Sequence, residues 1–133
     1  MAKERTFIFI KPDGVSRGLV GQILARFESR GLVISELKKM EISPELSDRH
    51  YEEHVDKAFY PRLKKYVTSG SVVAAIFEGE NAVSVVRAMC GATDPCQADP
   101  GTIRGDFALS LDANIIHSSD SVESASREIQ NFF

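Results

Sequence analysis

The feature of this sequence that most limits its fold is the alternation of short apolar runs with stretches of helical periodicity. Residues 7–10 and 72–77 are continuous apolar runs, which are typical of strands covered on both faces, and residues 72–77 are predicted to be central in a sheet. Between these runs, apolar side chains in residues 20–27 recur at helical spacing, which predicts a helix ending near Gly31. Strands that alternate with helices indicate a layered α/β architecture.

The rest of the chain continues this alternation. The further predicted elements are a strand at 32–40, a helix that Ser43 caps and that carries His50, Tyr51 and His54, helices at 61–66, 82–89 and 122–132, and a strand at 114–117. Residues 91–113 show no sustained period, and loops of this length in compact domains are usually functional or disordered. The order β-α-β-α-α-β-α-loop-β-α favours one domain over residues 1–133, in which helices cover a sheet of about four strands.

Charge and cysteine content exclude several classes of protein. The net charge of -3 opposes non-specific attraction to nucleic acid or to anionic membranes. Only four apolar residues precede Lys11 after the charged N-terminus, too few for a signal peptide or a membrane span, so a cytoplasmic location is expected. Cys90 and Cys96 have no metal-type spacing and are expected to be thiols.

Several short motifs are present but weak. Glycines at 14, 18 and 21 match neither a Rossmann fingerprint nor a P-loop, and they are expected to serve a turn and close packing. His50 and His54 fit the H-x-x-E-H pattern of some zinc proteases, but a solvated polar helix face is the favoured explanation. The tripeptide Arg104-Gly-Asp is discounted as an integrin motif, and with Phe107 it is only faintly similar to an RNA-recognition strand.

The most informative stretch is residues 114–121, in which His117 ends a predicted strand just before a helix. The positive end of that helix disfavours an imidazolium and favours a phosphorylated, anionic product at the same place. Glu128, in the helix that follows, is expected to fold back onto the other ring nitrogen and fix the tautomer. Asp120 and Glu123 are predicted to form a capping box for this helix.

Four separated blocks resemble the nucleoside diphosphate kinase family, and the resemblance covers nearly the whole chain. The blocks are residues 11–15 (KPDGV), 17–21 (RGLVG), 100–107 (PGTIRGDF), and 114–117 (NIIH) with 119–125 (SDSVESA). The resemblance implies a ferredoxin-like α/β sandwich (an α+β fold) with a four-stranded antiparallel sheet. It also implies transfer of the γ-phosphoryl group from a nucleoside triphosphate, typically ATP, to a nucleoside diphosphate in a ping-pong cycle through phosphorylated His117.

The same resemblance implies the nucleotide site. The matching positions are Lys11 and Asn114 for the ribose and the transferred phosphoryl group, Arg87, Thr93 and Arg104 for the other phosphates, Tyr51 beside His117, and Phe59 for stacking on the base. Arg87 also points away from the apolar stripe of its predicted helix, which leaves it free to face a ligand. Arg87 or Arg104, taken alone, would be interpreted as a solvated surface residue. The joint match of these positions to one family reverses that expectation.

The resemblance further implies Mg²⁺ bridging the nucleotide phosphates, with Asp120 touching it through water and no direct protein ligand. It implies a homo-oligomer built from dimers, a tetramer or a hexamer, and neither a membrane nor a specific nucleic acid as partner. The sequence departs from the family at Ser118, where relatives usually have glycine and where a side chain is expected to crowd the phosphorylated ring or restrict the turn. The chain also ends at Phe133, whereas most relatives continue for a short segment that often contacts a neighbouring subunit.

A second class of function stays open on the sequence alone. A ferredoxin-like domain can bind nucleotides or nucleic acid without turnover, although the acidic net charge argues against nucleic acid. An enzyme of the proposed type would acquire an acid-labile phosphoryl label from ATP, and a binding module would not.

Overall fold

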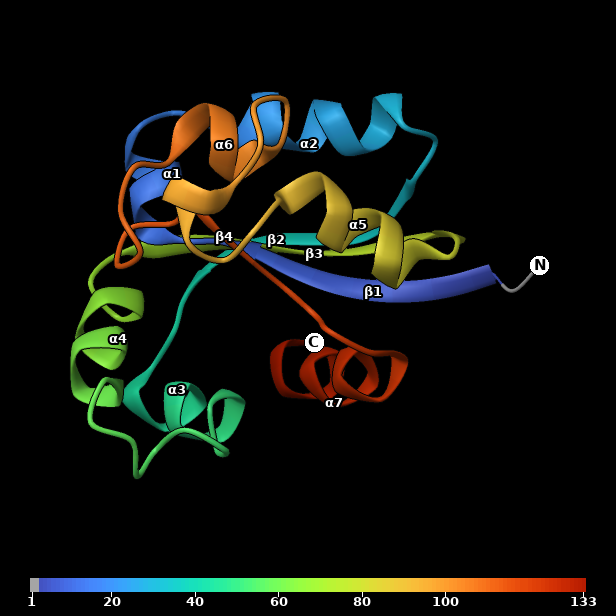
Figure 1. The fold of residues 1–133 in the computed structure, drawn as a ribbon. Coiled ribbons are helices and arrows are strands. Elements are labelled where there is room, and N and C mark those ends of the chain that lie inside the picture. The colour runs from blue at the N-terminus through green and yellow to red at the C-terminus, as the bar shows by residue number, and fades with distance from the viewer. Residues whose placement is uncertain (1–2) are drawn as a thin grey trace.

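The computed structural model describes residues 3–133, which form a four-stranded antiparallel sheet with helices on both faces (Figure 1). The strands are β1 (Lys3–Ile10), β2 (Val33–Glu41), β3 (Ser71–Glu80) and β4 (Ile116–Ser118), in the order β2-β3-β1-β4. Each neighbouring pair is antiparallel. The predicted α+β sandwich is therefore confirmed, and β3 is an inner strand as predicted.

Helices form the two outer layers. They are α1 (Pro12–Ser16), α2 (Val20–Ser29), α3 (Pro44–His50), α4 (Tyr60–Val67), α5 (Ala82–Cys90), α6 (Ile103–Phe107) and α7 (Val122–Phe132), with a 3₁₀ turn η1 (Pro95–Gln97). Helices α1, α2, α5 and α6 lie on one face of the sheet, and α3, α4 and α7 lie on the other (Figure 1). None of the helices in the described part of the chain has the length and apolar character needed to cross a bilayer.

Strand β1 joins the two layers because its side chains alternate between them. Ile8 and Ile10 belong to the apolar core under α2 and α5, whereas Phe7 and Phe9 belong to the core under α3, α4 and α7. All four side chains are fully buried. Burial of one such side chain contributes about 1.5–3 kcal/mol, so this single strand anchors both helical layers.

The predicted helix after Ser43 is shorter than expected. The Ser43 hydroxyl caps it as predicted, accepting a hydrogen bond from the Leu46 N–H at 3.0 Å. The helix ends at His50, however, and Tyr51 leaves helical geometry while His54 lies in the following turns. The prediction failed because the buried stripe stops at Tyr51: residues 52–59 are all exposed or half-buried, so no packing holds them in a helix.

Other boundaries also differ from the predictions. The expected loop at 91–113 contains η1 and α6, and α1 occupies the expected turn after β1.

The cap of α7 also differs from the prediction. Ser121, and not Asp120, caps α7 by accepting a hydrogen bond from the Ser124 N–H at 3.0 Å, so the predicted capping box is wrong. The segment around Arg104 is helical and not an RNA-recognition strand. Gly14 is needed for close packing, because a Cβ there would lie 2.7 Å from an Ile10 methyl carbon.

Candidate active site

A cleft of about 830 Å³ opens beside β4, a size within the range of small-molecule sites. The structure brings every sequence-predicted site residue to its wall: Lys11, Tyr51, Phe59, Arg87, Thr93, Arg104, Asn114, His117, Asp120 and Glu128. These residues come from distant parts of the chain and from both helical layers. The fold therefore gathers the predicted residues around one space.

The backbone just before His117 is held in a rare conformation. Ile115 has a φ of 76°, which is unusual for a β-branched residue and costs about 1–3 kcal/mol. Two hydrogen bonds hold it there: the Lys11 N–H donates to the Ile115 carbonyl at 2.8 Å, and the Ile115 N–H donates to Asp13 Oδ2 at 3.2 Å. The strand consequently begins at Ile116, later than predicted, and it pairs His117 with Phe9 of β1.

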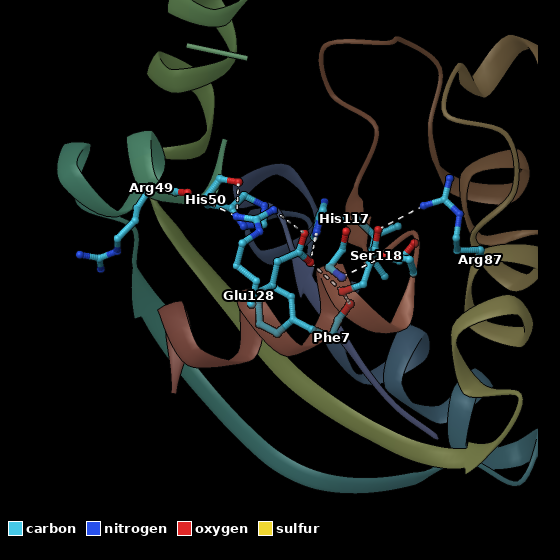
Figure 2. A network of polar contacts seen from close by, with 12 residues as sticks. Phe7, Arg49, His50, Arg87, His117, Ser118 and Glu128 are labelled. Carbon is cyan, nitrogen blue, oxygen red and sulfur yellow. Dashed lines mark hydrogen bonds and ion pairs between the residues drawn. The ribbon is translucent and has the colours of Figure 1, made fainter. Parts of the chain in front are cut away.

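The imidazole of His117 is fixed by a carboxylate and by an aromatic face. Its Nε2 lies 2.9 Å from Glu128 Oε1, which reaches across from α7 (Figure 2). A carboxylate only accepts hydrogen bonds, so this contact places the proton on Nε2 and leaves the lone pair on Nδ1. The ring also stacks on Phe9, with centroids 5.1 Å apart. The imidazole side chain keeps 21% of its surface exposed, which leaves it accessible from the cleft.

Glu128 is itself held in place by a residue that the sequence did not indicate. The Ser119 hydroxyl, fully buried, lies 2.6 Å from the same Oε1 atom, and the Ser119 N–H is tied to the Phe7 carbonyl at 3.0 Å. Arg127 approaches the other carboxylate oxygen at 3.9 Å. No local pattern links Ser119 to a residue nine positions later, so only the tertiary structure shows this contact.

Lys11 and Asn114 form a buried polar chain that reaches the loop after α5. Lys11 Nζ donates to Asn114 Oδ1 at 2.7 Å, and Asn114 Nδ2 donates to the Thr93 carbonyl at 3.0 Å. Burial and the nearby Arg104 guanidinium lower the pKa of Lys11 to about 8, partly offset by Asp13. The ammonium group is thus poorly compensated, and an anion in the cleft would stabilise it.

The two arginines are placed differently. Arg87 is exposed, as predicted from its helix, and its Nη1 donates to the Ser118 carbonyl at 3.3 Å (Figure 2). Arg104 is 7% exposed and donates to the carbonyls of Gly91, Asn114 and Ile116 at 2.8, 3.3 and 2.6 Å. Arg104 therefore fastens the loop after α5 to β4, while its remaining N–H groups stay available to the cleft. The burial of Arg104 also excludes Arg104-Gly-Asp as an integrin-binding motif.

Tyr51, Phe59 and Asp120 complete the cleft. Burial raises the pKa of Tyr51, so its phenol stays a hydrogen-bond donor. Phe59 is 52% exposed at the start of α4, which is unusual for a large aromatic side chain. Its ring lies 5.6 Å from the His54 ring and 5.9 Å from Lys57 Nζ. Asp120 is exposed at the rim, and a hydrogen bond from the Ser124 side chain lowers the pKa of its carboxyl group.

His50 contradicts the solvated polar helix face that was the favoured expectation for it, because its side chain is buried against the sheet. It does not share a helix face with His54, so the zinc-protease arrangement is wrong. Its ring is 4% exposed and packs edge-on against His117, with centroids 4.6 Å apart. Burial is the main cause that lowers the pKa of His50 to about 2, and the neighbouring His117 and the charges of Arg127 and Lys11 act in the same direction. His50 is thus a neutral neighbour of His117.

The structure accommodates the serine that follows His117. Ser118 is buried, pairs with Ile8 in β4, and is not among the described residues with positive φ. Cys90, beside it, is a buried thiol and Cys96 an exposed one, as predicted. The expected restriction of a turn at Ser118 is therefore not seen, because Ser118 lies in strand β4. Crowding of the phosphorylated ring stays a prediction.

Ser118→Gly should lower the free energy of unfolding by about 0.5–1 kcal/mol, because glycine in a strand loses more conformational entropy on folding. Urea unfolding of Ser118→Gly and of the control Ser118→Ala would separate this backbone effect from the loss of the hydroxyl group. A glycine variant more stable than the wild type would mean that the serine side chain is strained after all.

The comparisons with known proteins agree with this geometry. The nucleoside diphosphate kinase family model matches residues 4–133. The chain is 59% identical over 130 residues to a nucleoside diphosphate kinase of Thermus thermophilus, covering 98% of this chain and 95% of that protein. It is 54% identical over 133 residues to the enzyme of Saccharolobus solfataricus, covering 100% of this chain and 96% of that protein.

Solved structures give the same result. A halophilic nucleoside diphosphate kinase from Halobacterium salinarum, in complex with CDP, superposes with a TM-score of 0.96 at 48% identity, covering 99% of this chain and 88% of that one. The enzyme of Encephalitozoon cuniculi superposes with a TM-score of 0.96 at 41% identity, covering 98% and 88%. The match extends over nearly the whole chain, and the chain belongs to the nucleoside diphosphate kinase family.

Proposed function

We propose that this protein transfers the γ-phosphoryl group of a nucleoside triphosphate to a nucleoside diphosphate through phosphorylated His117. The observation that carries the proposal is the accessible imidazole whose Nε2 is bound to Glu128, at the wall of a cleft that also contains Lys11, Arg87 and Arg104. The relative from Halobacterium salinarum was solved with CDP, which supports a nucleotide as the ligand of this cleft.

The proposed reaction has two half-reactions. In the first, the Nδ1 lone pair of His117 attacks the γ-phosphorus, a P–N bond forms, and the bond to the bridging oxygen breaks, so that the diphosphate leaves with that electron pair. In the second, an oxygen of the acceptor diphosphate attacks the phosphohistidine, and the P–N electrons return to Nδ1. Glu128 keeps the Nε2 proton in place throughout and balances the positive charge on the phosphorylated ring.

Phosphoryl transfer needs mainly positioning and charge stabilisation from the protein. We assign Lys11 and Asn114 to the ribose and the transferred group, and Arg87, Thr93 and Arg104 to the other phosphates. Tyr51 lies at the same wall as a buried phenol donor. The positive side chains of Lys11, Arg87 and Arg104 are concentrated in the cleft, although the chain as a whole carries a net charge of -3.

The exposed ring of Phe59 is assigned to the base. A stacking contact accepts any base, because every base presents a π face, whereas hydrogen bonds to base edges would select one. Phe59 lies in the cleft wall and carries no polar group. Broad tolerance for the base follows from this arrangement.

We assign Mg²⁺ as the cofactor, held by the nucleotide phosphates and by Asp120 through water. The donor set fits: Asp120 is an exposed carboxylate at the rim whose pKa is lowered, whereas Glu128 is committed to His117 and Ser119. Mg²⁺ keeps most of its water ligands and needs few protein ones. When bound, it neutralises charge on the phosphate oxygens.

A homo-oligomer built from dimers, a tetramer or a hexamer, is proposed as the working assembly. Strand β2 supports this assembly, because β2 is an edge strand with Val33 and Leu37 exposed at 61% and 48%.

We also propose a cytoplasmic location, which fits the unpaired thiols Cys90 and Cys96.

Labelling tests the proposed function directly. Incubation with ATP labelled in the γ position should give a protein-bound label that is lost in acid, stable in base, and discharged by a diphosphate acceptor. The alternative, a nucleotide or nucleic-acid binding module without turnover, predicts binding without label. The relatives over the whole chain are kinases, which favours the enzyme.

The low pKa of Lys11 predicts that nucleotide binding depends on pH. A bound phosphate favours the charged amine, so the dissociation constant for a diphosphate should rise roughly tenfold between pH 7 and pH 9 as free Lys11 loses its proton near pH 8. Lys11→Arg should show a flat profile over this range, because arginine stays charged, whatever its absolute affinity. Calorimetric titration at each pH would measure both, and an equal slope in the two proteins would contradict the assignment.

A further inference from the structure

Two histidines in the cleft wall have buried ring nitrogens without a hydrogen-bond partner among the described residues: one nitrogen of His54, and both nitrogens of His50. Both ring nitrogens of His50 are buried and make no hydrogen bond in the described part of the chain. A buried polar atom without a partner costs about 1–3 kcal/mol, so such a group is normally explained by a ligand or a water molecule. The proposed phosphoryl transfer does not use His50, and the residue is therefore unexplained by that function.

The position of His50 gives a candidate explanation. One ligand atom from each of His50, His117 and Glu128 lies within 4.8 Å of the other two. Figure 2 shows these residues close together, His50 at the end of α3, His117 in β4 and Glu128 in α7. Two imidazoles and one carboxylate form the ligand set of one class of catalytic zinc sites, in which the fourth position holds water.

We propose that His50, His117 and Glu128 bind a transition-metal cation, Zn²⁺ in the first instance, and that this cation inhibits the enzyme. Imidazole nitrogen is a good ligand for Zn²⁺ and a poor one for Mg²⁺, which prefers oxygen, so this site is distinct from that of the nucleotide-bound Mg²⁺. Zn²⁺ binds nitrogen and oxygen ligands at about 2.0–2.2 Å, so the three atoms have to move closer together to share one ion. Rotation about the side-chain bonds of His117 and Glu128 would provide this movement.

The inhibition rests on the proposed role of His117 as nucleophile. A neutral imidazole has one lone pair in the ring plane and one N–H group. A cation bound to Nε2, in place of the hydrogen bond to Glu128, takes that lone pair and leaves the proton on Nδ1. Nδ1 then cannot attack phosphorus, so the metal and the phosphoryl group exclude each other without competing for the same atom.

The charges near the three ligands determine how strongly the site is expected to bind Zn²⁺. Glu128 contributes one negative charge, while Lys11 and Arg127 place positive charges nearby. His54 also faces this region without belonging to the cluster. Two cations beside the ion weaken its binding relative to a zinc enzyme, so the site should load and release Zn²⁺ reversibly.

Binding is tested with the metal alone. Equilibrium dialysis against buffered free Zn²⁺ should give one ion per chain, and Co²⁺ should give the visible absorption of a four- or five-coordinate site. His50→Gln should raise the dissociation constant at least about 10-fold. His50→Phe, which keeps the aromatic packing but offers no ligand atom, should do the same, while His54→Gln should leave the affinity for the metal unchanged.

Inhibition is tested separately, by measuring the phosphoryl label from MgATP at fixed free Zn²⁺. The zinc concentration for half-maximal loss of label should match the dissociation constant and rise at least about 10-fold in His50→Phe. Binding that does not depend on His50 would overturn the site, and binding without loss of label would overturn the inhibition. Absence of label in metal-free protein would instead contradict the proposed function and leave the binding result intact.

Discussion

His117→Gln is expected to abolish phosphoryl transfer, by at least about 10⁴-fold, while nucleotide binding persists. Glutamine offers no basic ring nitrogen, so no covalent intermediate can form. Its amide can still donate to Glu128, and Lys11, Arg87 and Arg104 stay in place around the phosphates. The loss should therefore fall on kcat, with the dissociation constant for a diphosphate changing by no more than about 3-fold.

Two measurements check this result. Transfer is followed by a coupled assay with ATP and a diphosphate acceptor, and binding by calorimetric titration of the same diphosphate. His54→Gln is the matched control, because His54 does not contact Glu128 and this variant should still acquire the acid-labile label. An equal loss of binding and transfer in His117→Gln would show that His117 holds the nucleotide and is not the nucleophile.

The sequence predicted the main fold because its long elements carry strong periodicity. The apolar run at 72–77 became the inner strand β3, and the helical stripe at 20–27 became α2. The short helices α1 and α6 were missed, since five residues are too few to show a period. Cap chemistry was the available signal: Pro12 begins α1, and the Thr102 hydroxyl caps α6 by accepting a hydrogen bond from the Gly105 N–H.

The site was predicted as a set of residues and not as a set of contacts. The resemblance supplied the residues of the cleft, and the proximity of Glu128 to His117 was expected because Glu128 lies in the helix that follows His117 and can fold back onto it. The contacts of His50 and Ser119 were not foreseen, because the first depends on how the end of α3 lies beside β4 and the second on how the residue after β4 meets α7. Tertiary contacts of this kind leave no periodic trace in one sequence.

Arg104→Ala should lower the free energy of unfolding by about 3–5 kcal/mol, far more than a surface arginine would. The side chain donates to three backbone carbonyls and is 7% exposed, so its removal leaves buried acceptors without donors. Arg62→Ala is the control: that arginine pairs with Asp112 at 3.2 Å but is 76% exposed. Its loss should cost at most about 1 kcal/mol.

Urea unfolding of both variants measures these costs. The affinity of each variant for a diphosphate is then measured without urea, where Arg104→Ala is still folded. Affinity for a diphosphate should also fall, because the loop that carries Thr93 loses its attachment to β4 and one cation leaves the cleft. Arg104→Lys keeps the charge but cannot hold three carbonyls at once, so it should recover part of the affinity and little of the stability. If lysine restored both, charge alone would account for Arg104, and the contacts to Gly91, Asn114 and Ile116 would not be what holds this wall of the cleft together.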